Sequence, residues 1–335
     1  MKASSSKAFC LTLLLACMVP ASGREAPSIT TSFTEFWSAA KGKPFLQQEH
    51  AWNRSIESLR RDVYDTVVWE KQHDPYWQAR RQIWLQKRFE RYPALAADIP
   101  VEVRALQDAV AHQSVRFKTL FPDADAHPPV TILLAPNFDA KSGVLGNGKP
   151  VLVFAVDTLL LEHANLDIVV PHELFHLYHA QHAGIRNDGV MPDAPLTLPL
   201  FEEGLATYVS GELSPGHTDG ELLLEDELGA IPANQLPEIA RRFLADARSK
   251  AIDPEHPDIF KRWFNAAPRP YQQGLPNRSG YWLGLQLIRH LRRSYAPAHI
   301  AAWSPEQADA QITAALQQVG SQELPSRQTK SAEAH

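Results

Sequence analysis

The segment His172-Glu173-Leu174-Phe175-His176 constrains the fold of this 335-residue chain more than any other feature of its sequence. A helix turns by about 100° per residue, so His172 and His176 lie about 40° apart, and both imidazoles can reach one metal ion. Glu173 then lies beside the ion, where it can accept a proton from bound water as a general base. Zinc suits these ligands, and a site with three protein ligands keeps one position for water. The segment therefore predicts one catalytic Zn²⁺.

A third protein ligand must come from elsewhere in the chain, and one candidate is His182. His172, His176 and His182 match a metzincin-like pattern in which a glycine turn brings a third histidine back to the metal. Here His179 occupies the glycine position, so the helix is expected to continue and to carry His182 about 80° away from His172. This ligand set is the alternative. We expect His179 to line the pocket.

The other candidates are two neighbouring carboxylates in a short helix predicted after a Pro-rich loop. Glu203 shares a helix face with Thr207 and Ser210, and Gly204 adjoins this face. We therefore expect this side to approach the histidine helix closely. Glu202 lies on the apolar side, which indicates packing or the rim of the site. Helix geometry favours Glu203 as the ligand and keeps Glu202 as the weaker choice.

The segment Glu203-Gly204-Leu205-Ala206-Thr207-Tyr208 resembles the glutamate helix of the aminopeptidase N type gluzincins, where such a glutamate is the third zinc ligand. The resemblance covers roughly residues 165–212 and extends weakly to Ser279-Gly280-Tyr281-Trp282. The chain is also similar to predicted exported zinc-dependent proteases of the same clan, which includes thermolysin-like enzymes. The resemblance implies a zincin-like core, a peptide or protein substrate, and Glu203 as the ligand.

Peptide hydrolysis also needs a hydrogen-bond donor for the oxyanion that develops on the scissile carbonyl. In the family a tyrosine or histidine of the C-terminal helical part does this, and the resemblance assigns the role to Tyr281, which follows a flexible glycine. Core packing is the competing interpretation of Tyr281. The Gly-x-Met-Glu-Asn motif with which aminopeptidase N enzymes hold a free amine is absent from the sequence. An endopeptidase is therefore favoured over an aminopeptidase.

The first residues are typical of an export signal. Lys2 and Lys7 come first, then a mostly apolar run over 9–19, too short for a permanent membrane span, and small residues at 21–23. Cleavage there removes both cysteines and leaves a periplasmic or secreted protein that needs no disulfide. In the alternative, Leu14-Leu15-Ala16-Cys17 is a lipobox, and Cys17 carries a lipid anchor in the outer membrane.

Composition excludes several other functions. The chain has 33 Lys and Arg against 38 Asp and Glu, a net charge of −5, so it has no basic footprint for nucleic acid. Its mean hydropathy of −0.28 predicts no transmembrane span in the mature protein. Five of the eight tryptophans lie within 33–120 among arginines, as in Gln78-Ala79-Arg80-Arg81-Gln82. Their helical spacing predicts helix packing.

Hydrophobic periodicity and breaker residues define the other elements. Strands are expected over 130–135 and 151–156, with turn material such as Gly143 and Gly148 between them. We expect the strand over 151–156 to pair with an extended peptide. A helix is expected over 166–183, disturbed near its start by Pro171 and stopped by Gly184. The loop 184–198, longer than in aminopeptidase N relatives, is expected to cover the cleft before a helix over 199–210.

Together these features predict an α+β, mostly helical chain: a zincin-like catalytic core with a small β-sheet over the active-site helix, flanked by N- and C-terminal helical segments. The predicted divisions are a signal peptide over 1–23, a helical region over 24–120, the catalytic core over 121–215, a C-terminal helical lobe over 216–320 and a disordered tail over 321–335. The predicted function is an exported zinc metallopeptidase. A catalytically silent, zincin-like envelope or binding protein is the second hypothesis.

Overall fold

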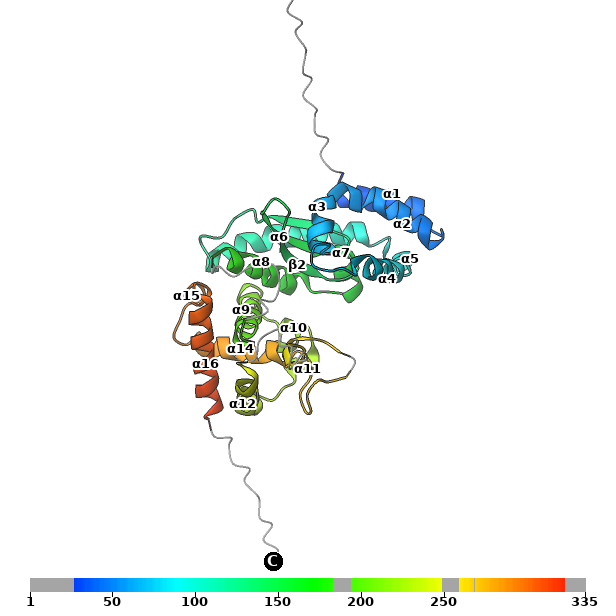
Figure 1. The fold of residues 1–335 in the computed structure, drawn as a ribbon. Helices are drawn as coiled ribbons and strands as arrows, with labels where there is room; N and C mark the ends of the chain where they lie inside the picture. Colours follow the sequence, from blue (N-terminus) through cyan, green and yellow to red (C-terminus); the bar gives the residue numbers. More distant parts are fainter. Residues whose placement is uncertain (1–26, 183–193, 249–258, 268, 323–335) are drawn as a thin grey trace, which may run out of the picture.

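The computed structural model describes residues 27–182, 194–248, 259–267 and 269–322 (Figure 1). In this part the chain is mostly helical and contains one three-stranded sheet, which confirms the α+β expectation. The predicted signal peptide with Cys17, the stop at Gly184 and most of the predicted tail lie outside the described residues. Among the described helices, none combines the length and the apolar character that a membrane crossing requires.

Helices make up the region before the sheet, as apolar spacing predicts. Trp52 is fully buried, packs edge-on against Phe36 with ring centroids 5.3 Å apart, and stacks on Tyr92 at 6.3 Å. Its position in the core agrees with the predicted packing role. The elements are α1 (Ile29–Ala40), α2 (Phe45–Ser55), η1 (Glu57–Arg60), α3 (Arg61–Val63), η2 (Tyr64–Val68), α4 (Trp77–Phe89), α5 (Tyr92–Leu95) and α6 (Ile99–Leu120).

A buried carboxylate joins these helices to the sheet. Asp157, in the first turn of α7 (Val156–Glu162), accepts hydrogen bonds from the Tyr92 hydroxyl and from the Ala135 N–H, both at 2.9 Å. The Arg88 guanidinium lies 3.5 Å from the same carboxylate. Burial raises the pKa of Asp157, and these three donors oppose that rise. The N-terminal helices are therefore attached to the sheet by polar contacts as well as by apolar packing.

The sheet contains one strand that sequence patterns missed. β1 (Val130–Leu133) pairs in parallel with β3 (Pro150–Ala155), and β2 (Ala140–Val144) pairs antiparallel with β3 on its other side. β2 lacks an apolar run because it is an edge strand, and its Gly143 looked like turn material. A Cβ at Gly143 would lie 2.9 Å from a Val67 methyl, so this glycine marks close packing against η2.

The central position of β3 makes one prediction wrong. The strand over 151–156 was expected to pair with an extended peptide, but β1 and β2 already occupy both of its edges. The edge strands of the described sheet are instead β1 and β2.

The helix that carries the two histidines is continuous through its proline. α8 (Leu166–His182) was expected to be disturbed by Pro171, which cannot donate a hydrogen bond to the Asp167 carbonyl. The Ser214 hydroxyl donates to that carbonyl instead, and the Ser210 hydroxyl donates to the Ile168 carbonyl at 2.7 Å. The helix therefore keeps its polar groups paired, and the two serines attach the next helix to it.

That next helix, α9 (Thr197–Leu213), lies between α8 and α14 (Ser279–Leu291). Gly204 was expected to approach α8, but it faces α14: a Cβ there would lie 2.4 Å from the carbonyl carbon of Gly284. In Figure 1, α9 and α14 cross below α8 and the sheet. The remaining elements are α10 (Asp219–Leu222), α11 (Asp226–Gly229), η3 (Ala233–Gln235), α12 (Leu236–Asp246), α13 (Ile259–Phe264), α15 (Pro297–Ala301) and α16 (Pro305–Gly320).

The Gly204–Gly284 contact predicts the effect of a single methyl group. We expect Gly204→Ala to lower the free energy of unfolding by about 1–3 kcal/mol, because overpacking against backbone outweighs the ~1 kcal/mol that alanine contributes to a helix. Urea unfolding monitored by circular dichroism measures this. Gly146→Ala is the control, since no atom lies within 4 Å of its added Cβ. Equal stability of the two variants would contradict the contact.

Candidate metal centre

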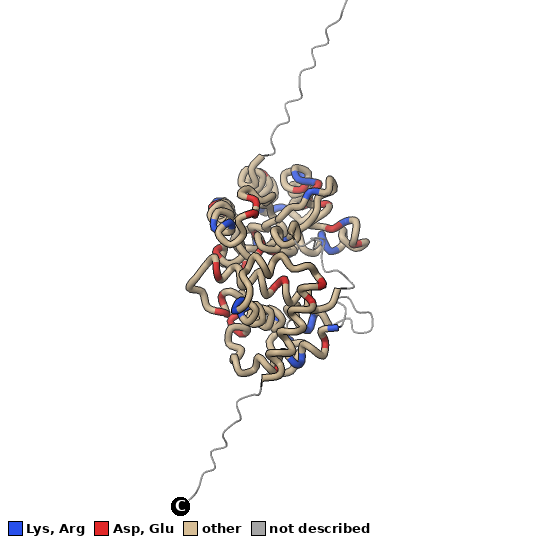
Figure 2. The backbone as a smooth tube through the Cα atoms, turned by 90° about the vertical axis from the view of Figure 1, so that its left-hand side faces the viewer, with Lys and Arg blue, Asp and Glu red and all other residues tan. Residues whose placement is uncertain are grey.

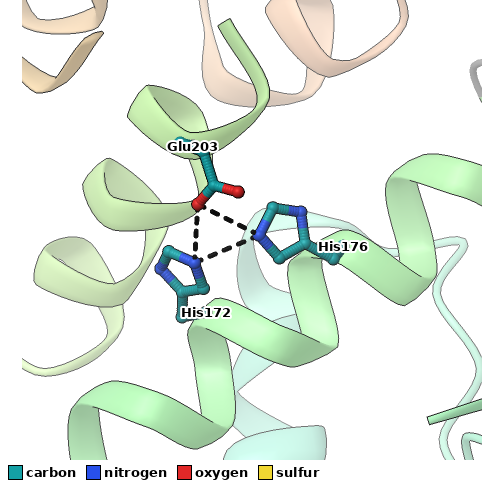
Figure 3. A group of neighbouring side chains, drawn as sticks. All are labelled: His172, His176 and Glu203. Atoms are coloured by element: carbon teal, nitrogen blue, oxygen red, sulfur yellow. Dashed lines mark hydrogen bonds and ion pairs between the residues drawn. The ribbon is translucent and has the colours of Figure 1, made fainter. Parts of the chain in front are cut away.

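Two helices bring three ligand atoms together (Figure 3). α8 presents His172 and His176, whose Nε2 atoms are 3.1 Å apart. α9 presents Glu203, whose Oε2 lies 3.3 Å from His172 Nε2 and 3.6 Å from His176 Nε2. These three residues form the one cluster of this kind among the described residues. The predicted ligand set is therefore assembled in space.

The size of this triangle suits zinc. Zn–N and Zn–O bonds of about 2.0–2.1 Å in tetrahedral geometry place neighbouring ligand atoms about 3.3 Å apart. The three separations of 3.1, 3.3 and 3.6 Å bracket that value. All three side chains are partly exposed to one cavity of about 510 Å³. Two imidazoles and one carboxylate, open on one side, are the donor set of a catalytic zinc site.

Charge couples the three ligands. Burial alone would raise the pKa of Glu203, but the charge of His176 and the hydrogen bonds from both histidines hold it well below its usual range. Burial lowers the pKa of His176, and the adjacent Glu203 carboxylate outweighs this effect and raises it to about 9. Without a metal, an imidazolium and a carboxylate therefore share the site, and a metal ion would take the place of the proton.

Glu173 lines the same cavity but does not belong to the ligand cluster. Burial raises its pKa, while the two histidines oppose the rise. A half-buried carboxyl beside a metal position is the arrangement that a general base requires.

The alternative ligands lie apart from the triangle. Glu202 lines the cavity outside the cluster, and burial raises its pKa to about 7. His182 turns away: its ring stacks on Tyr178 at 4.0 Å, and its Nε2 lies 3.5 Å from Asp123. The helix continues past His179, as expected, so His182 is carried away from the other two histidines.

The prediction for His179 is wrong. Its side chain is 2% exposed and does not line the cavity. It stacks on Phe175 at 5.1 Å and meets the edge of Phe201 at 5.4 Å. Burial lowers its pKa to about 3, so it is a neutral member of the core.

Tyr281 lines the same cavity as the three ligands. The guanidinium of Arg278 lies 4.4 Å from the centre of its ring, and Phe264 packs edge-on at 6.2 Å. Burial raises the pKa of Tyr281, and the charges of Glu203 and Glu173 raise it further while Arg278 lowers it. The hydroxyl therefore keeps its proton and can donate it in a hydrogen bond. Tyr281 therefore both lines the cavity and packs against Phe264, and its role as oxyanion donor stays a prediction.

Sequence reasoning missed the other walls of the cavity. Residues 139–142, which are the start of the edge strand β2 and the residue before it, form one wall, and apolar side chains form another. Arg278, with a left-handed backbone at φ 58°, lies at the start of α14 beside Tyr281. The sequence contains no signal for Arg278 beyond its position directly before the predicted helix. The apolar wall comprises Leu222, Leu223, Leu224, Phe260 and Phe264.

Comparisons with protein-family models, curated proteins and solved structures found no match to this chain. The candidate site therefore rests on its own geometry and chemistry.

Zinc binding is expected to strengthen with pH up to about 9, because His176 must lose its proton before its Nε2 can coordinate. One released proton corresponds to about tenfold in the association constant per pH unit. Competition with a chromophoric chelator at several pH values measures this slope.

Variants identify the third ligand in the same assay. Glu203→Gln should weaken zinc binding strongly, and His182→Ala should leave it unchanged. Loss of zinc in His182→Ala with retention in Glu203→Gln would instead favour the three-histidine site.

Proposed function

We propose that this protein is a zinc-dependent metallopeptidase with a zincin-like core of the gluzincin type, and that it acts as an endopeptidase. One observation carries the proposal: two imidazoles and a carboxylate converge at zinc spacing, and a further carboxyl and a tyrosine line the same cavity. Zn²⁺ held by His172, His176 and Glu203 would polarise a carbonyl and lower the pKa of water to about 7.

The residues of the chain have separate tasks in this proposal. Glu173 accepts the proton of the attacking water and then delivers it to the leaving amine. Tyr281 donates a hydrogen bond to the oxyanion of the tetrahedral intermediate. Its raised pKa keeps the hydroxyl protonated, so that the donor is available at neutral pH.

The walls of the cavity support a peptide as substrate. β2 is an edge strand, and an extended peptide can add to such an edge through main-chain hydrogen bonds. The apolar wall would suit large apolar side chains of a substrate. In that wall Leu224 is 45% exposed and has a left-handed backbone at φ 54°. Exposure and backbone strain at a cavity wall are typical of a binding surface. The Arg289 guanidinium donates two hydrogen bonds of 2.7 Å to Asp219, the first residue of α10, and so attaches the helix that precedes Leu224 to α14.

The proposed compartment is outside the cytoplasm. This part of the proposal rests on the signal-like residues 1–23 alone, with lipidation of Cys17 as the alternative to cleavage.

The general base is tested by removing its charge and keeping its shape. We expect Glu173→Gln to retain one bound zinc and to lose about 10²- to 10⁴-fold in kcat for peptide hydrolysis. Metal analysis and a fluorescent casein digest measure the two properties. Glu90→Gln, an exposed glutamate of the N-terminal region, is the matched control. Unchanged hydrolysis in Glu173→Gln would overturn the mechanism, and zinc without hydrolysis in the wild-type protein would favour a binding protein.

The oxyanion donor is tested by deleting one hydroxyl. Tyr281→Phe should reduce kcat by about 10²- to 10³-fold with little change in KM, because the hydrogen bond forms chiefly in the transition state. Tyr76→Phe, at a tyrosine that is 74% exposed, controls for the loss of a hydroxyl elsewhere. A wild-type rate in Tyr281→Phe would assign Tyr281 to packing alone.

A further inference from the structure

A second cavity, of about 540 Å³, lies between α2 and α4 and shares no residue with the cavity of the metal centre. We call it the α2–α4 groove. Gln78, Arg81 and Gln82 of α4 line it, and none of them has a role in the proposed peptidase mechanism. Its lining is almost entirely polar, with the indole of Trp77 as the one aromatic group.

The floor of the groove is held rigidly. Arg81 is 7% exposed and donates to Glu57, Glu49 and Asn53 with its three different nitrogens. The same Glu57 oxygen also accepts the indole N–H groups of Trp52 at 2.8 Å and Trp69 at 3.1 Å. These contacts fix the donors and acceptors before any ligand arrives, which lowers the entropy cost of binding.

Several polar groups of the groove remain unused. The second oxygens of Glu49 and Glu57 have no hydrogen bond to another described residue, and the same holds for the side chains of Arg61, Gln78 and Gln82. Gln78 and Gln82 are exposed and lie one helical turn apart on α4, so both border the groove. The groove therefore offers free donors and free acceptors side by side.

The charges of the lining cancel. The lining contains three acidic and three basic side chains, and Figure 2 shows both signs interspersed along the described chain. An ion of either sign gains no net attraction here, and a nucleic acid would require an excess of cations. A peptide that adds as a strand would need a sheet edge, and an amphipathic helix would need an apolar groove. Helices form the walls of this groove, and its lining is mostly polar. The charged residues are Glu49, Glu57, Asp65, Arg61, Lys71 and Arg81.

A carbohydrate matches these properties. Each hydroxyl group both donates and accepts hydrogen bonds, as the free groups of the groove require. The indole of Trp77 is half-buried at the groove, and the Lys71 ammonium lies over its ring, 4.3 Å from the centre. Lys71 therefore covers one face of the indole, and a sugar ring would pack against the indole surface that Lys71 leaves open. We propose that the α2–α4 groove binds a neutral oligosaccharide, independently of the metal centre.

An ion pair between neighbouring residues connects the groove to the cavity of the metal centre. Lys71 lines the groove, and the adjacent Glu70 pairs with Lys141 of β2 at 2.7 Å. Lys141 lines the cavity of the metal centre. A saccharide in the groove would therefore be held near the peptide edge of the sheet.

Isothermal titration calorimetry of the full chain with chitohexaose, cellohexaose and maltohexaose tests the proposal. We expect at least one of these probes to bind at millimolar concentration or below, with one site per chain. The double variant Gln78→Ala/Gln82→Ala should weaken binding at least about tenfold, since it removes two hydrogen-bonding amides. Arg61→Gln should weaken it as well.

Matched controls separate the groove from other causes. Gln72→Ala/Gln107→Ala removes two exposed glutamines outside the groove and should leave the affinity unchanged. Glu203→Gln should also bind the sugar normally, so failure of the peptidase proposal does not affect this one. Absence of binding by all three probes overturns the proposal, as does binding that the groove variants leave unaltered.

Discussion

The candidate site depends on how α9 is held between two other helices. Toward α8, Ser210 and Ser214 donate to carbonyls near Pro171, so the missing N–H of a proline creates the acceptor that attaches the neighbouring helix. Toward α14, Gly204 meets Gly284 with no room for a side chain on either. Glu203 lies between these two contacts, one residue before Gly204. A small rotation of α9 would therefore move the carboxylate out of the 3.3–3.6 Å range that it keeps from both imidazoles.

The same contact positions the other half of the site. Tyr281 precedes Gly284 by about one helical turn, so the glycine crossing that locates Glu203 also brings Tyr281 to the cavity. Burial raises the pKa of both titratable groups. Glu173 can therefore take up a proton, and the Tyr281 hydroxyl keeps its own. The backbone contact between Gly204 and Gly284 thus places Glu203 and Tyr281 at the same cavity.

Parts of the structure could be predicted because they depend on local spacing. The two histidines and the face that carries Glu203 follow from the helical period of 3.6 residues, and the strands expected over 130–135 and 151–156 follow from short apolar runs; the structure has them at 130–133 and 150–155. β2 could not be found this way, because an edge strand with a glycine has no apolar run. The effect of Pro171 was mispredicted because its compensation comes from two serines of the next helix, about forty residues further along the chain. The prediction for His179 was wrong because helical periodicity gives the face on which a residue lies but does not show that Phe201 of the next helix packs there.

The sequence by itself determined that His172 and His176 can share one ion and that Glu173 must lie beside it, since a single helix sets these relations through its own geometry. It also determined an acidic, mostly helical chain with a small sheet. Only the tertiary structure decided that Glu203, and not Glu202 or His182, joins the two histidines. It also decided that β2 is an edge strand that lines the same cavity and that a polar groove lies between α2 and α4. These relations join residues distant in the chain, and the packing of helices and strands sets the distances between them.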